Sequence, residues 1–233
     1  MVVATKDRLA EKPVRAATVD SRSEILAAAA DCFKERGYSA TSIDDVARRL
    51  RATKGMIYHH FRSKTDLFFA VYQRGMEINF ACIEPYRNQP GPALERLARM
   101  SYAHAVTMMA EQAFQRTQAQ GVDMHLSGAT TAAQREMLDK LIASRDEYEA
   151  IFRSASDAVV LEEGLSLKDT SLAVKNYLSV LNATVYWYSP RTDDLRKEQD
   201  ELACDVLNFA LRGLGAEPPK LDYSRSMKEL TDE

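Results

Sequence analysis

The chain has 233 residues, of which 45% are hydrophobic and 28% charged, and this ordinary composition excludes disorder as its dominant state. No apolar run approaches the roughly 18 to 20 residues of a membrane helix, and the N-terminal segment mixes Lys, Arg, Asp and Glu, so we expect a cytoplasmic protein without a membrane association. Cys32, Cys82 and Cys204 are widely separated and lack metal-ligand spacing, which favours buried, packed thiols over disulfides or a zinc site.

Positive charge is concentrated in the N-terminal third of the chain. Residues 1–75 contain 14 Lys and Arg against 9 Asp and Glu, whereas residues 76–233 contain 17 against 25. A phosphate backbone responds to local positive charge rather than to the average of a protein, so only the N-terminal part is suited to nucleic acid. Because an uneven scatter of charges would give the same counts, charge alone does not establish DNA binding.

A flexible basic arm followed by a first helix is predicted at the start of the chain. Residues 1–19 carry four basic side chains and a proline but no helical apolar stripe. Ser21 can form a capping box with Glu24, and apolar residues then recur at helical spacing until Gly37, which supplies a left-handed stop.

Two short helices and the start of a fourth follow. Thr41 and Ser42 are alternative N-caps for the second helix, and Thr53 can cap the third, which continues to about residue 61. Ser63, with Asp66 three residues later, marks the start of the fourth helix.

The remainder of the chain is also predicted to be helical, so the fold class is all-α. Apolar residues keep the helical period, and the turn signals of β-hairpins are absent from the sequence. Helices are expected at residues 92–119 with a break near Glu111, 131–163, 169–188 and 195–214. A loop is expected at residues 121–128, and the proline-containing, charged residues 215–233 are expected to form a flexible tail.

The second and third helices fit a helix-turn-helix, in which a short helix and a tight turn precede a helix that enters the major groove. Ala47 permits a close helix crossing, and Ala52 and Ile57 are placed to fill a small core. The residues expected to face outward near the start of the third helix are Lys54, Gly55, Met56 and Tyr58.

Several short motifs fall at fixed spacing within residues 25–67. They are Phe33-x-x-x-Gly37-Tyr38, Thr41-Ser42, Lys54-Gly55, Ile57-Tyr58-x-His60-Phe61 and Ser63-Lys64. With these motifs the segment closely resembles the N-terminal domain of the TetR family of regulators. The resemblance implies a helix-turn-helix DNA-binding domain, placed at residues 20–66, and a ligand-binding and dimerisation domain, placed at residues 67–214.

The same resemblance implies which residues meet DNA. Phosphate contacts are expected from Thr41 or Ser42, Thr53, His60 and Lys64. Contacts with base edges or a thymine methyl are expected from Lys54, Gly55, Met56 and Tyr58.

Arg51 departs from the family pattern, which has glycine in the turn between the two short helices. A non-glycine residue at positive φ costs roughly 1 kcal/mol. Either the turn is reshaped, or Arg51 tolerates the strain and adds a phosphate contact.

Neither a metal, a cofactor nor an enzymatic activity is expected. The adjacent His59 and His60 would point about 100° apart on a helix, and no third ligand is near them in sequence. The sequence also lacks a nucleophile elbow, a catalytic triad context and a cofactor fingerprint.

The middle and later helices contain methionine and aromatic residues that could line a ligand pocket. The candidates are Met100, His104, Met108, Phe114, Tyr148, Phe152, Tyr177, Asn182 and Tyr186; each could instead be plain core. Two segments, Arg145–Phe152 and Leu181–Pro190, resemble a TetR subgroup that senses acyl-CoA or related lipid metabolites.

These observations predict a homodimeric repressor that a small apolar effector releases from palindromic, double-stranded operator DNA. Broad apolar stripes at residues 169–188 and 195–214 fit a four-helix dimer interface, or alternatively an intrachain core. A DNA-binding factor without any effector is the alternative function.

Overall fold

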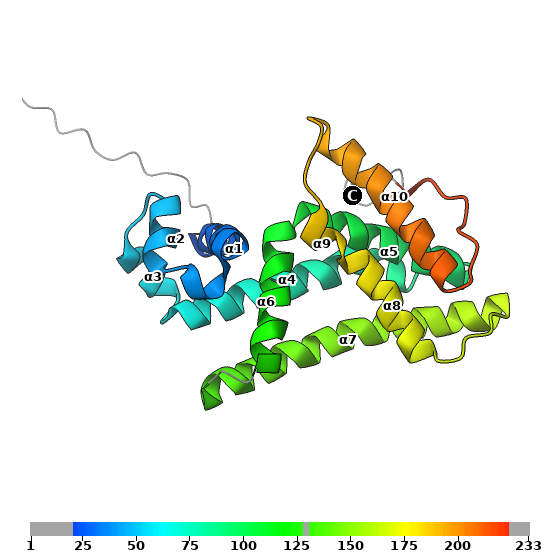
Figure 1. Ribbon diagram of the computed structural model, residues 1–233, viewed down its shortest axis with the longest axis horizontal. Coiled ribbons are helices and arrows are strands. Elements are labelled where there is room, and N and C mark those ends of the chain that lie inside the picture. The colour runs from blue at the N-terminus through cyan, green and yellow to red at the C-terminus, as the bar shows by residue number, and fades with distance from the viewer. Residues whose placement is uncertain (1–20, 128–130, 224–233) are drawn as a thin grey trace, which may run out of the picture.

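The computed structural model describes residues 21–127 and 131–223, and within these ranges it contains ten helices and no strand (Figure 1). The all-α prediction is therefore confirmed. In chain order the helices are α1 (Ser21–Ala40), α2 (Ile43–Arg49), α3 (Lys54–His60), α4 (Lys64–Arg87), α5 (Ala93–Ala110), α6 (Gln112–Ser127), α7 (Ala132–Glu163), α8 (Thr170–Asn182), α9 (Thr184–Trp187) and α10 (Leu195–Gly213).

Helices α1 to α3 form a small group at one end of the molecule (Figure 1). Ile25 and Phe33 of α1, Val46 of α2 and Ile57 of α3 are buried together in its core. Gly37 has a φ of 76°, which breaks the helical backbone near the end of α1 as the sequence predicted.

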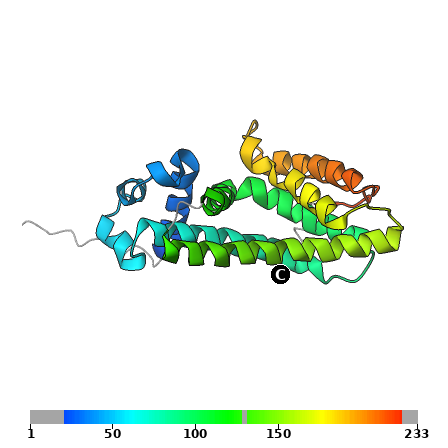
Figure 2. The ribbon, with the colours of Figure 1, turned by 60° about the horizontal axis from the view of Figure 1, so that its bottom comes forward.

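The long helices α4 and α7 run side by side along the length of the molecule (Figure 2). Helix α6 packs against both α1 and α4, so it joins the N-terminal group to the larger C-terminal group. Helices α8 and α10 pack on each other and on α5, at the side of the molecule away from α3 (Figure 1). None of the described helices is long and apolar enough to cross a membrane.

The loop predicted at residues 121–128 is wrong for residues 121–127, which continue α6, and residues 128–130 lie outside the described ranges. The prediction treated Gly121 as a loop signal, whereas this glycine is needed for packing. A Cβ atom at Gly121 would lie 2.6 Å from the Tyr72 ring, so the absence of a side chain lets α6 approach α4 closely.

Of two further predicted features, one is confirmed and the other is wrong. The expected break near Glu111 is present, because α5 ends at Ala110 and α6 begins at Gln112. The single helix expected at residues 169–188 is instead divided at Ala183 into α8 and α9.

Part of the predicted flexible tail is packed. Ala216 and Tyr223 are buried, and the Tyr223 ring stacks on Tyr102 with 4.9 Å between centroids. The expected tail is therefore wrong for these residues. The predicted basic arm at residues 1–19 and the end of the tail lie outside the described ranges.

Candidate nucleic-acid interface and ligand pocket

Side-chain caps fix the two short helices of the helix-turn-helix. Ser42, rather than Thr41, caps α2, and it forms a reciprocal capping box with Asp45. Hydrogen bonds from the Ser42 hydroxyl and then from its backbone N–H, aided by Arg36 and Arg48, lower the pKa of Asp45 to about 2. Thr53 caps α3 by accepting a hydrogen bond from the Met56 N–H.

The turn between α2 and α3 is strained at Arg51. Its φ of 52° is the only positive φ of a non-glycine residue in the described ranges, so the turn keeps the geometry that glycine usually serves. The Ala52 N–H donates to the Ala47 carbonyl at 2.9 Å, which closes the turn. Arg51 is exposed, and no ion pair joins it to any other described residue.

The first turns of α3 present a mixed polar and aromatic surface. Thr53, Lys54 and Gly55 are exposed, and the Tyr58 side chain is 51% exposed although it is large and aromatic. Met56 differs from the prediction because it is half-buried and packs against the core. Lys54 forms an ion pair of 2.7 Å with Asp44 of α2, which holds its ammonium near the start of the helix.

Three of the residues predicted to contact phosphates, Thr41, Lys64 and His60, have side chains that bind partners within the chain instead. Thr41 is buried, and its hydroxyl donates to the carbonyls of Cys32 and Gly37, so the structure does not place its side chain on the surface. The Lys64 ammonium donates to the Tyr38 carbonyl at 2.9 Å and lies over the Tyr38 ring.

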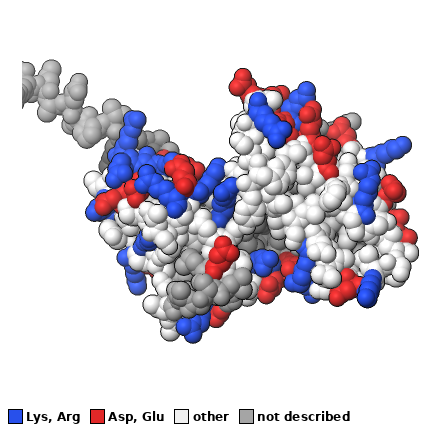
Figure 3. Space-filling model, in the orientation of Figure 1, with Lys and Arg blue, Asp and Glu red and all other residues white. Residues whose placement is uncertain are grey.

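His60 is half-buried, and its Nε2 atom lies 2.9 Å from the Ser21 hydroxyl. Of the expected phosphate contacts, Ser42 and Thr53 are therefore the most accessible. Figure 3 shows Lys and Arg side chains gathered with interspersed acids over the α1–α2 end of the molecule.

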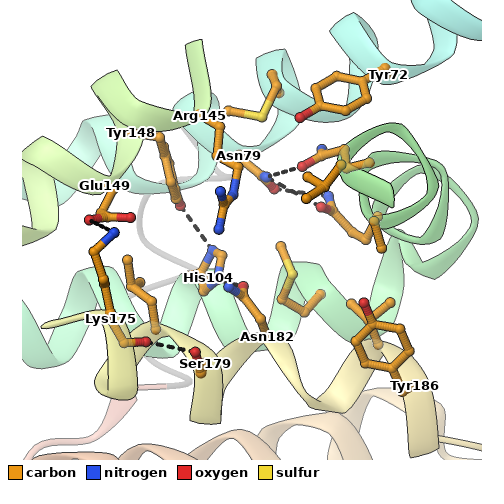
Figure 4. Close-up of a pocket in the computed structure, with 18 of the residues that line it drawn as sticks. Tyr72, Asn79, His104, Arg145, Tyr148, Glu149, Lys175, Ser179, Asn182 and Tyr186 are labelled. Carbon is orange, nitrogen blue, oxygen red and sulfur yellow. Dashed lines mark hydrogen bonds and ion pairs between the residues drawn. The ribbon is translucent and has the colours of Figure 1, made fainter. Parts of the chain in front are cut away.

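A cavity of about 400 Å³ lies between helices α4 to α9. Its volume is at the small end of the range of about 300 to 1,000 Å³ that is typical of small-molecule sites. Five of the predicted pocket residues line it: His104, Met108, Tyr148, Asn182 and Tyr186. Figure 4 shows how most of these side chains converge from α5, α7 and α8.

The other four predicted pocket residues do not line this cavity. Met100 and Phe152 are fully buried in the core, and Phe114 is half-buried against it. Tyr177 is also buried; its hydroxyl donates to Ser101, and its ring borders a separate groove between α8 and α10. For these positions, apolar character reflects core packing, which is the alternative that the sequence left open.

Sequence reasoning missed the lining residues of α4 and α6 and others of α7, α8 and α9. They are Tyr72, Met76, Asn79, Gln115, Gln118, Ala119, Val122, Asp123, Arg145, Glu149, Lys175, Leu178, Ser179 and Val185. One signal was available, because Asn79 lies three residues after Met76 and four before Ile83 and so falls on the apolar face of its helix. A buried amide at such a position needs a polar partner, which points to a cavity or a neighbouring polar helix.

A chain of hydrogen bonds crosses the cavity through His104. The Tyr148 hydroxyl lies 2.9 Å from His104 Nδ1, and His104 Nε2 lies 2.8 Å from the Asn182 side-chain oxygen (Figure 4). Burial lowers the pKa of His104 to about 4, so the imidazole is neutral near pH 7. A neutral ring that donates a hydrogen bond from Nε2 to Asn182 can accept a hydrogen bond from the Tyr148 hydroxyl at Nδ1. Both ring nitrogens are then satisfied.

The other polar groups of the cavity are mostly paired with one another. Asn79 and Gln115 exchange two amide hydrogen bonds, and Asn79 also donates to Gln118. The buried carboxylate of Glu149 accepts from Arg153 at 2.9 Å and forms an ion pair of 3.3 Å with Lys175.

Helix α6 connects this cavity to the helix-turn-helix. Gln115, Gln118 and Val122 line the cavity from one face of α6. From another face of the same helix, the Gln120 side chain accepts a hydrogen bond from the Tyr38 N–H at 2.9 Å and donates one to the Phe33 carbonyl at 3.0 Å. A single helix therefore contacts both the cavity and α1.

The N-terminal half of α6 also holds α9. Gln112 donates to the carbonyls of Val185 and Tyr188, and Arg116 donates to those of Val185 and Tyr186. These bonds satisfy carbonyls that the short α9 leaves without helical partners. Tyr186, at the mouth of the cavity, is thereby fixed beside α6.

An apolar surface extends over α8, α9 and α10. Leu172, Trp187, Leu195 and Phe209 are 56%, 49%, 47% and 69% exposed. Between α8 and α10 a groove of about 410 Å³ is lined by Leu172, Val180 and Phe209 among others. Figure 3 shows few charged side chains over the region of α8 and α9. The inner sides of α8 and α10 are intrachain core, since Leu181 and Leu207 are fully buried.

Known proteins share both halves of this architecture. The family model for bacterial regulatory proteins of the tetR family matches residues 25–71, and the model for the tetracyclin repressor-like C-terminal domain matches residues 90–214, which is more than half of the chain. The HTH-type transcriptional regulator AcrR of Shigella flexneri is 25% identical over 197 residues, covering 82% of this chain and 90% of AcrR.

Solved structures agree with these matches. PfmR, a TetR family transcriptional regulator from Thermus thermophilus, is 28% identical with a TM-score of 0.64, over 79% of this chain and 97% of PfmR. AibR, solved in complex with isovaleryl coenzyme A and operator DNA, has the same fold, with a TM-score of 0.64 at 20% identity, over 86% of this chain and 100% of AibR. The chain therefore belongs to the TetR family and is a transcriptional regulator of that family.

Proposed function

We propose that this regulator represses transcription from a palindromic operator and is released when a small molecule occupies the cavity that helices α4 to α9 line. The observation that carries the proposal is the double role of α6, which lines the cavity with Gln115 and Gln118 and hydrogen bonds to α1 through Gln120. A ligand can weaken DNA binding only if it prefers a conformation in which the DNA-binding helices are wrongly placed.

The exposed face of α3 is the proposed contact with the major groove. Lys54 can donate to a guanine edge, the exposed Tyr58 ring can contact a base or a thymine methyl, and Gly55 lets the backbone approach closely. Ser42 and Thr53, at the starts of α2 and α3, are proposed to contact phosphates on either side of the groove.

A second copy of the chain is proposed to cover the apolar surface of α8, α9 and α10. Exposed apolar side chains as large as Leu172, Trp187 and Phe209 on one surface favour burial against a partner. A two-fold dimer presents its recognition helices to two half-sites, so the operator is an imperfect palindrome.

The cavity favours an effector-responsive regulator over a DNA-binding factor without an effector. AibR, which shares this fold, was solved with an acyl coenzyme A and operator DNA. This likeness supports an acyl compound as effector, with its apolar part among Met76, Met108 and Leu178. Because amides and charged groups line the cavity as well, an effector that carries a polar group, as an acyl-CoA or related lipid metabolite does, fits better than a wholly apolar one.

A footprint on the DNA that flanks the regulator's own gene would identify the operator. Operator affinity would then be measured with a panel of acyl compounds and their coenzyme A thioesters. Release by a compound, with weaker binding of that compound in the presence of operator by the same factor, is the expected result. A compound that binds equally well with and without operator would contradict release through this compound.

A further inference from the structure

Arg145 of α7 is the group in the cavity that other polar contacts do not explain. Figure 4 shows its guanidinium directed into the cavity, toward His104. Among the described residues, no hydrogen bond or ion pair joins Arg145 to an acceptor. Lys175 and Arg153, the neighbouring cations, are by contrast both bound to Glu149.

Most polar groups that line the cavity have partners, although the exposed carboxylate of Asp123 also belongs to the lining. Asn79 and Gln115 satisfy each other, and the carboxylate of Glu149 is neutralised by its two cations. Both ring nitrogens of His104 are engaged, and the Asn182 oxygen accepts one of these bonds. The donors left without a partner include the five N–H groups of Arg145, the side-chain N–H groups of Asn182 and Gln118, and the Tyr72 hydroxyl, and Arg145 alone among them carries a positive charge.

A neutral, wholly apolar ligand does not suit this arrangement. It would displace water from the side of the Arg145 guanidinium that faces the cavity without offering an acceptor in exchange, which is unfavourable. A cationic ligand would be repelled by Arg145 and Lys175. A planar guanidinium is matched by the two oxygens of a carboxylate or a phosphate, which it binds through two parallel hydrogen bonds.

The rest of the cavity limits the size of the ligand and the nature of its body. Met76, Met108 and Leu178 provide a flexible apolar lining, and methionine side chains adapt to ligands of different shape. A volume of about 400 Å³ accommodates a small ligand rather than a long one.

We infer that the effector is a small anionic amphiphile, whose carboxylate or phosphate pairs with Arg145 while its apolar body packs against Met76, Met108 and Leu178. This inference rests on the proposed function and names the chemical class of its effector. The anionic group can belong to a free acid enclosed in the cavity or to the phosphates of a coenzyme A thioester, most of which would lie outside it, and binding measurements distinguish the two sources.

The test is isothermal titration of the full chain, without DNA, with octanoate, octanoyl coenzyme A and octanol. Arg145→Met removes the charge from an exposed side chain, so the fold should tolerate it, and circular dichroism would check this. Lys140→Met is the matched control, because Lys140 is an exposed cation of the same helix that does not line the cavity.

Octanoate or its thioester should bind the parent chain more tightly than octanol does. Arg145→Met should weaken this binding roughly tenfold to hundredfold, to the level of octanol, whereas Lys140→Met should leave it unchanged. If octanoate binds and octanoyl coenzyme A does not, the anionic group is a carboxylate. If only octanoyl coenzyme A binds, the anionic group is a phosphate. In either case Arg145→Met should abolish the preference for the anion over octanol.

Three results would overturn the inference. These are octanol binding as tightly as the anions, an Arg145→Met variant with undiminished anion affinity, and binding of none of the three compounds at millimolar concentration. Because DNA is absent, the result does not depend on release. An anion that binds through Arg145 but leaves operator affinity unchanged would contradict the proposed release and leave the anion site standing.

Discussion

The side chain of Gln120 on α6 bridges the break in α1, because its oxygen accepts from the Tyr38 N–H at 2.9 Å. Its amide nitrogen donates to the Phe33 carbonyl on the other side of Gly37. These bonds join α6 to α1, and in the proposed release a ligand that displaces α6 would thereby also displace the helix-turn-helix.

Gln120→Ala is therefore expected to weaken the coupling between effector and operator. Without the two hydrogen bonds, the factor by which a bound effector lowers operator affinity should fall toward one, from the roughly 5- to 150-fold that is typical of such coupling. Fluorescence anisotropy of a labelled operator, with and without effector, measures this factor. Gln73→Ala on the exposed face of α4 is the control. An unchanged factor in Gln120→Ala would exclude this route.

Arg51→Gly should change folding stability and DNA binding in opposite directions. Glycine removes the strain of a positive φ, so the free energy of unfolding should rise by about 1 kcal/mol. If Arg51 contacts a phosphate, operator affinity should fall, and the slope of its salt dependence should decrease by about two ions for the dimer, about one for each protomer.

Arg51→Lys keeps the charge and the strain, so this control should retain both the stability and the operator affinity of the parent chain. Denaturant titration and salt-dependent anisotropy measure the two quantities. If Arg51→Gly binds operator like the parent at every salt concentration, Arg51 makes no phosphate contact.

Thr41→Val should reduce stability without a change in operator affinity. The substitution keeps the shape of the side chain but removes a buried hydroxyl that donates to the Cys32 and Gly37 carbonyls, at an expected cost of about 1 to 2 kcal/mol. Ser42→Ala is the informative partner, because loss of this exposed cap should lower operator affinity as well as stability. Weaker operator binding by a fully folded Thr41→Val protein would restore Thr41 as a DNA contact.

The buried His104 predicts a pH dependence of stability. Its pKa of about 4 in the folded chain lies below the ordinary value of 6.5, so the unfolded chain takes up the proton first as the pH falls. The stabilisation is complete above pH 6.5 and is lost progressively between pH 6.5 and about 4. Melting temperatures across this window should therefore fall less steeply for His104→Gln than for the parent chain; equal slopes would mean that His104 titrates normally.

Much of the DNA-binding half could be predicted from the sequence because its signals are local. The cap at Thr53, the stop at Gly37 and the choice of Thr41 or Ser42 as the cap of α2 each depend on residues within one or two helical turns, whereas the sequence left open whether the turn at Arg51 is strained or reshaped. Lys64 differs, since its partner is the carbonyl of Tyr38, which is 26 residues away in sequence. Only the packing of α4 against α1 brings the two together.

The cavity was harder to predict because it depends on which faces of six helices meet. Met100 and Met108 are both buried methionines of α5, yet only Met108 reaches the cavity. Arg145 was missed because an arginine on an amphipathic helix is ordinarily a solvated residue. Gly121 shows the same limit, as its role is to admit the ring of Tyr72 from another helix.

The most direct test of the central claim, that α3 recognises operator sequence, is the ratio of affinities for operator and for a scrambled duplex. We predict that Lys54→Ala and Tyr58→Ala each lower this ratio by a factor that corresponds to about 1 to 3 kcal/mol, because both residues lie exposed near the start of α3. A ratio that stays at the parent value in both variants, with both proteins folded, would contradict the claim.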